Sequence, residues 1–196
     1  MPDPYVDPVT GVFHNRLGIV DEAELRRVEY KLAGVVEAEM LHRPEKGAFD
    51  LPHLQRIHKR LFEHVYDWAG QLRCVEISKG VYFCGFHYLE NFARSTFEAL
   101  HDERYLVGLT RDETLSRLAY FYSEVNALHP FREGNGRTQR IFFRDLMAGA
   151  GWRIGWEQVD PRDNIDACRY ALSKDESILA DMFDKVLTRL GTEQDE

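Results

Sequence analysis

The sequence predicts an all-α fold, a compact helical bundle that carries one β-hairpin. Apolar side chains recur every three or four residues over most of the 196-residue chain, the spacing that places them on one face of a helix. Helix-start signals precede two of these runs, at Asp21 with Glu24 and at Thr110 with Glu113. The shorter period of β-strands is confined to residues 72–84. We therefore expect a helical domain with the hairpin as its exception.

Two helices follow a turn-rich opening. Residues 1–20 are expected to wrap the surface, because their periodicity is interrupted by Pro2, Pro4, Pro8 and Gly11. Helical spacing then runs from Asp21 to about His42 and again from Leu51 to about Asp67. The histidines of the second run lack the i, i+4 pair of a helical zinc site, so we expect solvated or packing side chains at His53, His58 and His64.

Residues 71–86 are predicted to form the hairpin. Two β-type runs, residues 72–77 and 81–84, flank a tip of Ser78, Lys79 and Gly80. Cys74 and Cys84 lie at similar distances from this tip and could face each other. We expect them, and Cys168, to stay reduced, because the three cysteines lack metal-ligand spacing and nothing points to an oxidising compartment.

The second half of the chain continues the helical pattern. Helices are expected over residues 89–100, 110–128, 137–149, 161–170 and 175–190, with an extended run at 152–156. Phe131 is expected to anchor the loop after residue 128 in the core. No linker or repeat divides the sequence, so residues 1–196 are read as one domain.

Composition excludes several classes of protein. A hydrophobic content of 44% suffices for one sizeable core, and a net charge of −8 disfavours direct binding to nucleic acids or anionic membranes. No apolar run is long enough to span a bilayer, and the first residues do not resemble a signal peptide. A cytoplasmic location is therefore expected.

Residues 129–140 combine the features of a phosphate site. Gly134, Asn135 and Gly136 suit a turn with positive φ, in which successive backbone N–H groups can converge on one anion. The residues after this turn read as a helix that ends near Gly149. The turn should thus lie at a helix N-terminus, where unpaired N–H groups and the helix dipole favour negative charge.

Four further side chains complete this stretch. Arg137 and Arg140 are three residues apart and share a helix face, so both guanidinium groups can reach one polyphosphate. Glu133 is acidic among cationic groups, which suits a Mg²⁺ ion that bridges phosphate oxygens. His129 is the candidate general base, because an unperturbed histidine has a pKa of about 6.5.

Each of these features has an ordinary structural explanation when it occurs alone, but their order is specific. The stretch resembles the signature of Fic (Fido) domain proteins, His-Pro-Phe-x-(Asp/Glu)-Gly-Asn-Gly-Arg-x-x-Arg, with every specified position filled. The resemblance implies the Fic fold, with the hairpin as a flap beside the active site. It extends over most of the chain, though the match outside the signature is loose.

The resemblance also implies an activity. Fic proteins of this kind are protein adenylyltransferases, which transfer AMP from ATP, with Mg²⁺, to a Ser, Thr or Tyr hydroxyl of a target protein. By this resemblance His129 is the base, Glu133 holds the metal, and the nucleotide phosphates contact Gly134, Asn135, Gly136, Arg137 and Arg140. The flap would pair with an extended segment of the target, with Lys79 and Gly80 near the nucleotide.

Regulation follows from what the sequence lacks. Many Fic proteins are inhibited by a helix with the motif (Ser/Thr)-x-x-x-Glu-(Gly/Asn), whose glutamate pairs with the second arginine of the signature. Only Glu90 and Glu133 precede a suitable residue here, and the positions four residues earlier are Phe86 and His129. We therefore expect Arg140 to be open, and a separate small antitoxin to supply the helix. The short layout resembles bacterial Fic toxins, whose targets include the ATPase subunits of DNA gyrase and topoisomerase IV.

Two alternatives stay open on the sequence. The first is another Fic-type transfer, of UMP, phosphocholine or phosphate, which the signature alone does not distinguish. The second is a non-catalytic nucleotide-binding or interaction module, against which the filled signature argues. A Walker-type NTPase is disfavoured, because the turn lacks the GxxxxGK[ST] arrangement and a preceding strand.

Overall fold

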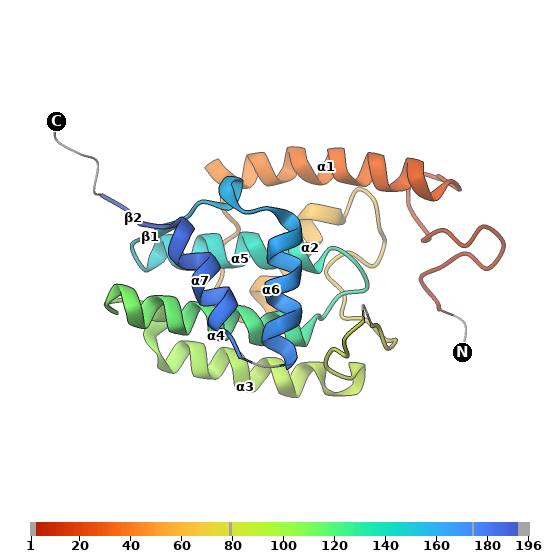
Figure 1. The fold of residues 1–196 in the computed structure, drawn as a ribbon. Coiled ribbons are helices and arrows are strands. Elements are labelled where there is room, and N and C mark those ends of the chain that lie inside the picture. The colour runs from red at the N-terminus through yellow and green to blue at the C-terminus, as the bar shows by residue number, and fades with distance from the viewer. Residues whose placement is uncertain (1–2, 79, 174, 192–196) are drawn as a thin grey trace.

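The computed structural model describes residues 3–78, 80–173 and 175–191, and these are mostly helical (Figure 1). The predicted fold class is confirmed. The α-helices are α1 Glu22–His42, α2 Leu51–Phe62, α3 Leu89–Asp102, α4 Arg111–Leu128, α5 Asn135–Gly149, α6 Pro161–Ser173 and α7 Ser177–Val186. Short 3-10 turns lie at Phe86–Tyr88, Arg104–Leu106 and Trp156–Gln158, and two strands at β1 Trp152–Ile154 and β2 Leu187–Arg189. None of the helices in these residues is long and apolar enough to cross a membrane.

Helices α4 and α5 form the centre of the bundle. Figure 1 shows α1 along one side and α3 along the other, with α4 and α5 between them and α6 crossing both. The central helices carry fully buried aromatic side chains, among them Phe121, Tyr122, Phe142 and Phe143. Burying each of these rings contributes roughly 1.5–3 kcal/mol, so the core fixes how the two helices lie. The loop that joins them, residues 129–134, is thereby held at one end of the bundle.

The helix-start signals act as the sequence predicts. Thr110 and Glu113 form both halves of a capping box, with the Thr110 N–H donating to Glu113 Oε2 at 2.9 Å. The Asp21 carboxylate accepts from the Glu24 N–H at 2.7 Å. These caps satisfy N–H groups that a helix leaves unpaired, and they set the first residues of α4 and α1.

The structure of residues 71–86 differs in detail from the predicted hairpin. The described residues between 71 and 86 contain no strand, and one antiparallel bridge between Ser78 and Tyr82 closes the turn. Their backbone groups bond elsewhere: the Arg73 N–H donates to the Pro130 carbonyl and the Cys84 N–H to the Ala127 carbonyl, at 2.9 and 2.8 Å. The segment therefore runs beside the end of α4 and the loop after it, as a flap should. Apart from the Ser78–Tyr82 bridge, these backbone groups bond to that neighbouring part of the chain and not across the hairpin.

The C-terminal part corrects a second prediction. Helix α7 ends at Val186, whereas the apolar spacing predicted a helix to residue 190. Residues Leu187–Arg189 instead form β2, antiparallel to β1 in the run that was predicted to be extended. The pairing buries Trp152, whose ring lies within 6.0 Å of the Arg111 guanidinium and 5.6 Å of that of Arg189. Backbone pairing and this ring packing therefore outweigh helical spacing here.

The N-terminal residues lie against the connection between α2 and the flap. The Arg16 N–H donates to the Val65 carbonyl at 2.8 Å, and the Tyr5 ring packs edge-on to Trp68 at 5.4 Å. Asp3 forms an ion pair with Arg132 at 2.7 Å. These contacts connect the start of the chain to the loop between α4 and α5.

Candidate active site

The loop between α4 and α5 is closed by its own side chains. His129, the C-cap of α4, has a left-handed φ of 41°, and Gly134, the N-cap of α5, has a φ of 82°. The Asn135 side chain accepts from the Phe131 N–H at 2.9 Å and donates to the Phe131 carbonyl at 2.8 Å. Phe131 is fully buried, so its predicted role as an anchor is confirmed. Asn135 therefore shapes the loop through its side chain, and only its backbone is left to meet a ligand.

His58 holds the far side of this loop, a role that the sequence did not reveal. Its Nε2 donates to the Glu133 carbonyl at 2.9 Å, while its Nδ1 accepts from the Gly70 N–H at 2.8 Å. The ring stacks on Phe131 with centroids 3.9 Å apart. Burial lowers the pKa of His58 to about 3. His58 is thus a neutral histidine that packs in the interior, which is one of the two roles expected from the sequence, solvated or packing.

Arg73 connects the flap to the catalytic histidine candidate. Its buried guanidinium donates to the His129 carbonyl at 2.8 Å, to the Val75 carbonyl at 2.9 Å and to the Cys84 carbonyl. A planar fork of donors can hold several carbonyls at once, which a lysine cannot. One side chain therefore connects both arms of the flap to the backbone of His129. Nothing in the local sequence around Arg73 indicates this role.

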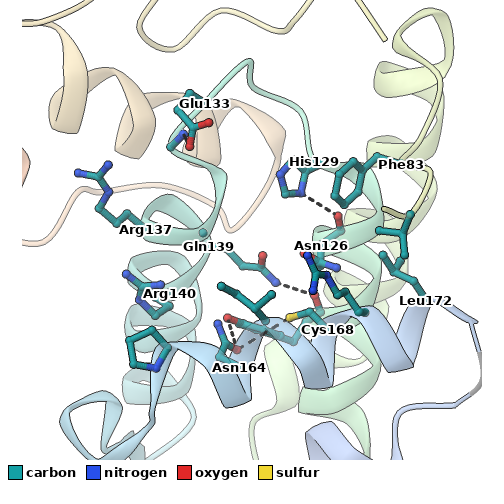
Figure 2. A pocket seen from close by; sticks show the side chains of 17 residues that line it. Phe83, Asn126, His129, Glu133, Arg137, Gln139, Arg140, Asn164, Cys168 and Leu172 are labelled. Atoms are coloured by element: carbon teal, nitrogen blue, oxygen red, sulfur yellow. Dashed lines mark hydrogen bonds between the residues drawn. The ribbon is translucent and has the colours of Figure 1, made fainter. Parts of the chain in front are cut away.

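The His129 imidazole is oriented by two neighbours. Its Nδ1 lies 3.2 Å from the Asn126 carbonyl, and since a carbonyl can only accept, Nδ1 carries the proton (Figure 2). Phe83 from the flap stacks on the ring, with centroids 3.8 Å apart and planes 18° apart. In this tautomer Nε2 is the nitrogen that can accept a proton.

A cavity of about 360 Å³ adjoins the imidazole, a volume in the range of small-molecule sites. The start of α5 contributes Gly134, Gly136 and Arg140 to its wall, and the flap contributes Val81 and Phe83. The opposite wall is formed by α6, through side chains that include Asn164, Cys168 and Leu172 (Figure 2). Of the two last helices, α6 is thus the one that encloses the site.

The two arginines of the signature have different surroundings. Figure 2 shows them on successive turns of α5, and both line the cavity. The Arg140 guanidinium has no hydrogen bond or ion pair with any residue that the structure describes. Arg137 forms an ion pair with Glu29 of α1, and its guanidinium lies 4.9 Å from the centre of the Phe62 ring. No pattern in the sequence singles out Glu29.

The other predicted site residues divide into those in the cavity and those outside it. Glu133 lines the cavity beside the start of α5. Gly80 lies at the flap turn with a φ of 77° and is exposed, while its neighbour Val81 reaches the cavity wall. Lys79 lies outside the described residues.

The donor set at Glu133 fits Mg²⁺. One carboxylate stands at the wall of a cavity that also holds an unpaired arginine. Mg²⁺ keeps several waters and binds proteins through one or two carboxylates plus substrate phosphates, so a cluster of protein ligands is not required. Among the described residues there is no group of three or more His, Cys, Asp or Glu side chains that could hold a metal unaided.

Together these features define a class of site. A helix N-terminus, a glycine-flanked turn and two arginines bind phosphate groups, and an oriented imidazole at the same cavity can accept a proton. The fold and site are therefore those of a helical protein whose cavity suits a phosphorylated ligand beside a base.

The chain belongs to the Fic/DOC family, whose match covers residues 48–147. It is 37% identical over 192 residues to the probable protein adenylyltransferase Fic of Escherichia coli, covering 96% of this chain and 94% of that one. It is 44% identical over 162 residues to protein adenylyltransferase VbhT of Bartonella schoenbuchensis, covering 82% of this chain. The chain spans only about a third of VbhT, 34% of its length.

Solved structures share the fold. The N-terminal Fic domain of a Bartonella effector protein from Bartonella sp. AR 15-3 superposes with a TM-score of 0.88 at 25% identity, over 94% of this chain and 91% of that one. A Fic domain from Bartonella quintana, solved with bound ADP, gives a TM-score of 0.89 at 23% identity, over 95% of each chain. At that identity the second likeness shows the fold alone.

Proposed function

We propose that this chain is a protein adenylyltransferase that transfers AMP from ATP to a hydroxyl group of a target protein. One observation carries the proposal: the oriented His129 imidazole and the unpaired Arg140 guanidinium line the same cavity at the start of α5. Relatives that match most of this chain are named protein adenylyltransferases, which supports the same reaction.

Phosphate binding falls to the start of α5. The backbone N–H groups of Gly134, Asn135 and Gly136 and the positive end of the helix dipole receive the α and β phosphates. Arg137 and Arg140 bind the outer phosphates, whose charge grows as pyrophosphate leaves. Mg²⁺ held by Glu133 would neutralise phosphate charge and keep the triphosphate in one conformation.

His129 supplies the base. Its Nε2 takes the proton of the target hydroxyl while that oxygen forms a bond to the α phosphorus. The bond between the α phosphorus and its bridging oxygen breaks, and pyrophosphate departs with the electron pair. Positioning and charge stabilisation dominate such transfers, so no covalent enzyme intermediate is required.

The flap receives the target. Tyr82 is 93% exposed at the closing bridge of the turn, and Phe83 beside it stacks on His129. An extended segment of the target pairs with this edge, which brings its hydroxyl to the imidazole without a strict sequence requirement. Lys79 and Gly80 lie near the nucleotide in this proposal.

The proposal extends to the biological role of the chain. The chain acts as a cytoplasmic toxin on the ATPase subunits of DNA gyrase and topoisomerase IV, and a small antitoxin inhibits it by placing a glutamate on Arg140. Its support is the absence of an acidic partner for Arg140 in the described residues and the lack of the inhibitory motif in the sequence. Expression of the chain alone should arrest growth, and co-expression of the antitoxin should prevent it.

The reaction is tested with ATP labelled at either the α or the γ phosphate. We expect the α label, and not the γ label, to appear on protein in a bacterial lysate or on purified topoisomerase subunits. His129→Ala should lower the rate by roughly 10²–10⁴ or more while ATP still binds. Transfer from labelled UTP or CDP-choline instead, transfer of the γ label, or nucleotide binding without any transfer would each contradict the proposal.

A further inference from the structure

The surroundings of Arg137 point to a residue in α1 that the proposed reaction depends on. The Arg137 side chain is 19% exposed and that of Glu29 in α1 is 9% exposed, so their ion pair is mostly shielded from water. Glu29 uses its two oxygens separately: Oε1 accepts from Arg137 Nη2, and Oε2 accepts from the Tyr66 hydroxyl. Three segments far apart in the chain therefore meet at one carboxylate.

Tyr66 keeps this carboxylate in place. Burial, and then its bond to Glu29, raise the pKa of Tyr66 above its usual value, so the hydroxyl stays protonated and donates. The Phe62 ring lies against the Arg137 guanidinium at 4.9 Å and restricts it further. The long arginine side chain is thus fixed on its α1 side before any ligand arrives.

The other edge of the guanidinium is left without an acceptor. Arg137 Nη1 is buried and has no hydrogen-bond partner in the part of the chain that the structure describes. A buried donor without an acceptor is costly, so such groups usually mark a missing ligand or water. Arg137 lines the 360 Å³ cavity, where a phosphate oxygen would supply this acceptor.

We infer that Glu29, held by Tyr66, is a positioning residue that orients Arg137 for the outer phosphates of the nucleotide. This inference rests on the proposed function of the same site. Glu29 lies in α1, before the residues 48–147 that match the family. A carboxylate that competed with the nucleotide would be expected to occupy both edges of the guanidinium, whereas Glu29 engages one and leaves the other.

Nucleotides of different length separate positioning from a structural role. Glu29→Gln keeps the shape and a hydrogen-bond acceptor but removes the charge. We expect it to weaken ATP binding roughly tenfold, as loss of a charge-assisted contact would, and to leave AMP binding unchanged because AMP lacks the outer phosphates. Tyr66→Phe should weaken ATP binding in the same direction by a smaller factor, and it keeps the test decisive if the Gln variant does not fold. Affinities are measured by titration calorimetry, with the thermal midpoint of each variant alongside.

Two further variants serve as a matched control and as a test of coupling between Glu29 and Arg137. Glu103→Gln removes the charge from another ion pair, with Arg117, that lies outside the cavity, and it should change neither affinity. Arg137→Ala should lose ATP affinity, and adding Glu29→Gln to it should cause no further loss, since coupled residues do not add.

The outcomes distinguish two failures. If Arg137→Ala binds ATP as the wild type does, the role of Arg137 in the proposed function is wrong. If Arg137→Ala loses ATP but Glu29→Gln and Tyr66→Phe do not, the inference about Glu29 is wrong and the proposed function stands. Tighter ATP binding by Glu29→Gln would make Glu29 a competitor, and equal losses for ATP and AMP would make its role structural; either overturns the inference.

Discussion

His58 should make the stability of the protein fall as the solution becomes acidic, and the fall should begin above the range where carboxylates titrate. The imidazole is buried and holds the Glu133 carbonyl and the Gly70 N–H, and burial lowers its pKa from 6.5 to about 3. Between these pH values the unfolded chain binds a proton that the folded chain does not. The stabilisation is therefore complete above pH 6.5 and is lost progressively towards pH 3.

The size of the effect follows from the two pKa values. The gap between them corresponds to about 5 kcal/mol of unfolding free energy over the whole window. Lowering the pH from about 7.5 to about 5.5 should by itself remove about 1.4 kcal/mol. This is measurable in urea, where small domains give linear unfolding free energies.

A non-titrating variant isolates this contribution. His58→Phe keeps a ring against Phe131 but leaves the Glu133 carbonyl and the Gly70 N–H unpaired, so it should be less stable at every pH. The decisive quantity is the slope: between the same two pH values the variant should lose about 1.4 kcal/mol less than the wild type. Equal slopes for wild type and His58→Phe would refute the reasoning.

Three further predictions concern the loop and the flap. Gly134→Ala should destabilise the fold by about 2–4 kcal/mol in urea unfolding, because an added Cβ would lie 2.4 Å from a Phe62 ring atom at a φ of 82°. A Cβ added at Gly136 would have no atom closer than 3.7 Å, so Gly136→Ala should leave stability about unchanged. Calorimetry should nevertheless show weaker ATP binding, since the methyl group would enter the cavity. Phe83→Ala should lower the turnover number more than ATP affinity, because the ring orients His129, and Phe83→Tyr should restore it; unchanged turnover in the Ala variant would exclude that role.

The helices and the glycine turn at the start of α5 could be predicted because their signals are local. The capping box at Thr110, the glycine turn and the spacing of Arg137 and Arg140 each lie within a few residues of one another, where periodicity and turn chemistry apply. Signals of that kind do not depend on how distant parts of the chain pack.

The residues that organise the site could not be predicted in the same way. His58, Arg73 and Glu29 act on groups far from them in the sequence, the Glu133 carbonyl, the His129 carbonyl and the Arg137 guanidinium respectively. Their roles exist only once the helices have packed. Local spacing marks none of these three residues, because burial and the distant partner become visible only in the folded chain.

Helix α2, predicted to run to about Asp67, ends at Phe62. The other two differences in secondary structure have a common cause. The flap residues could have paired with each other and Leu187–Arg189 could have extended α7, since local spacing allowed both. In each case backbone groups found partners in another segment: the end of α4 and the loop after it for the flap, which keeps one bridge of its own, and β1 for Leu187–Arg189. Tertiary hydrogen bonds therefore overrode local preference at both places.

The central claim is that the triphosphate lies against the start of α5 with its α phosphate facing His129. A crystal structure of the protein with Mg²⁺ and a non-hydrolysable ATP analogue tests this directly. We predict phosphate oxygens on the N–H groups of residues 134–136, outer phosphates on Arg137 and Arg140, and His129 Nε2 on the side of the α phosphorus open to an incoming hydroxyl. Phosphates bound elsewhere, or an imidazole turned into the interior, would contradict the account.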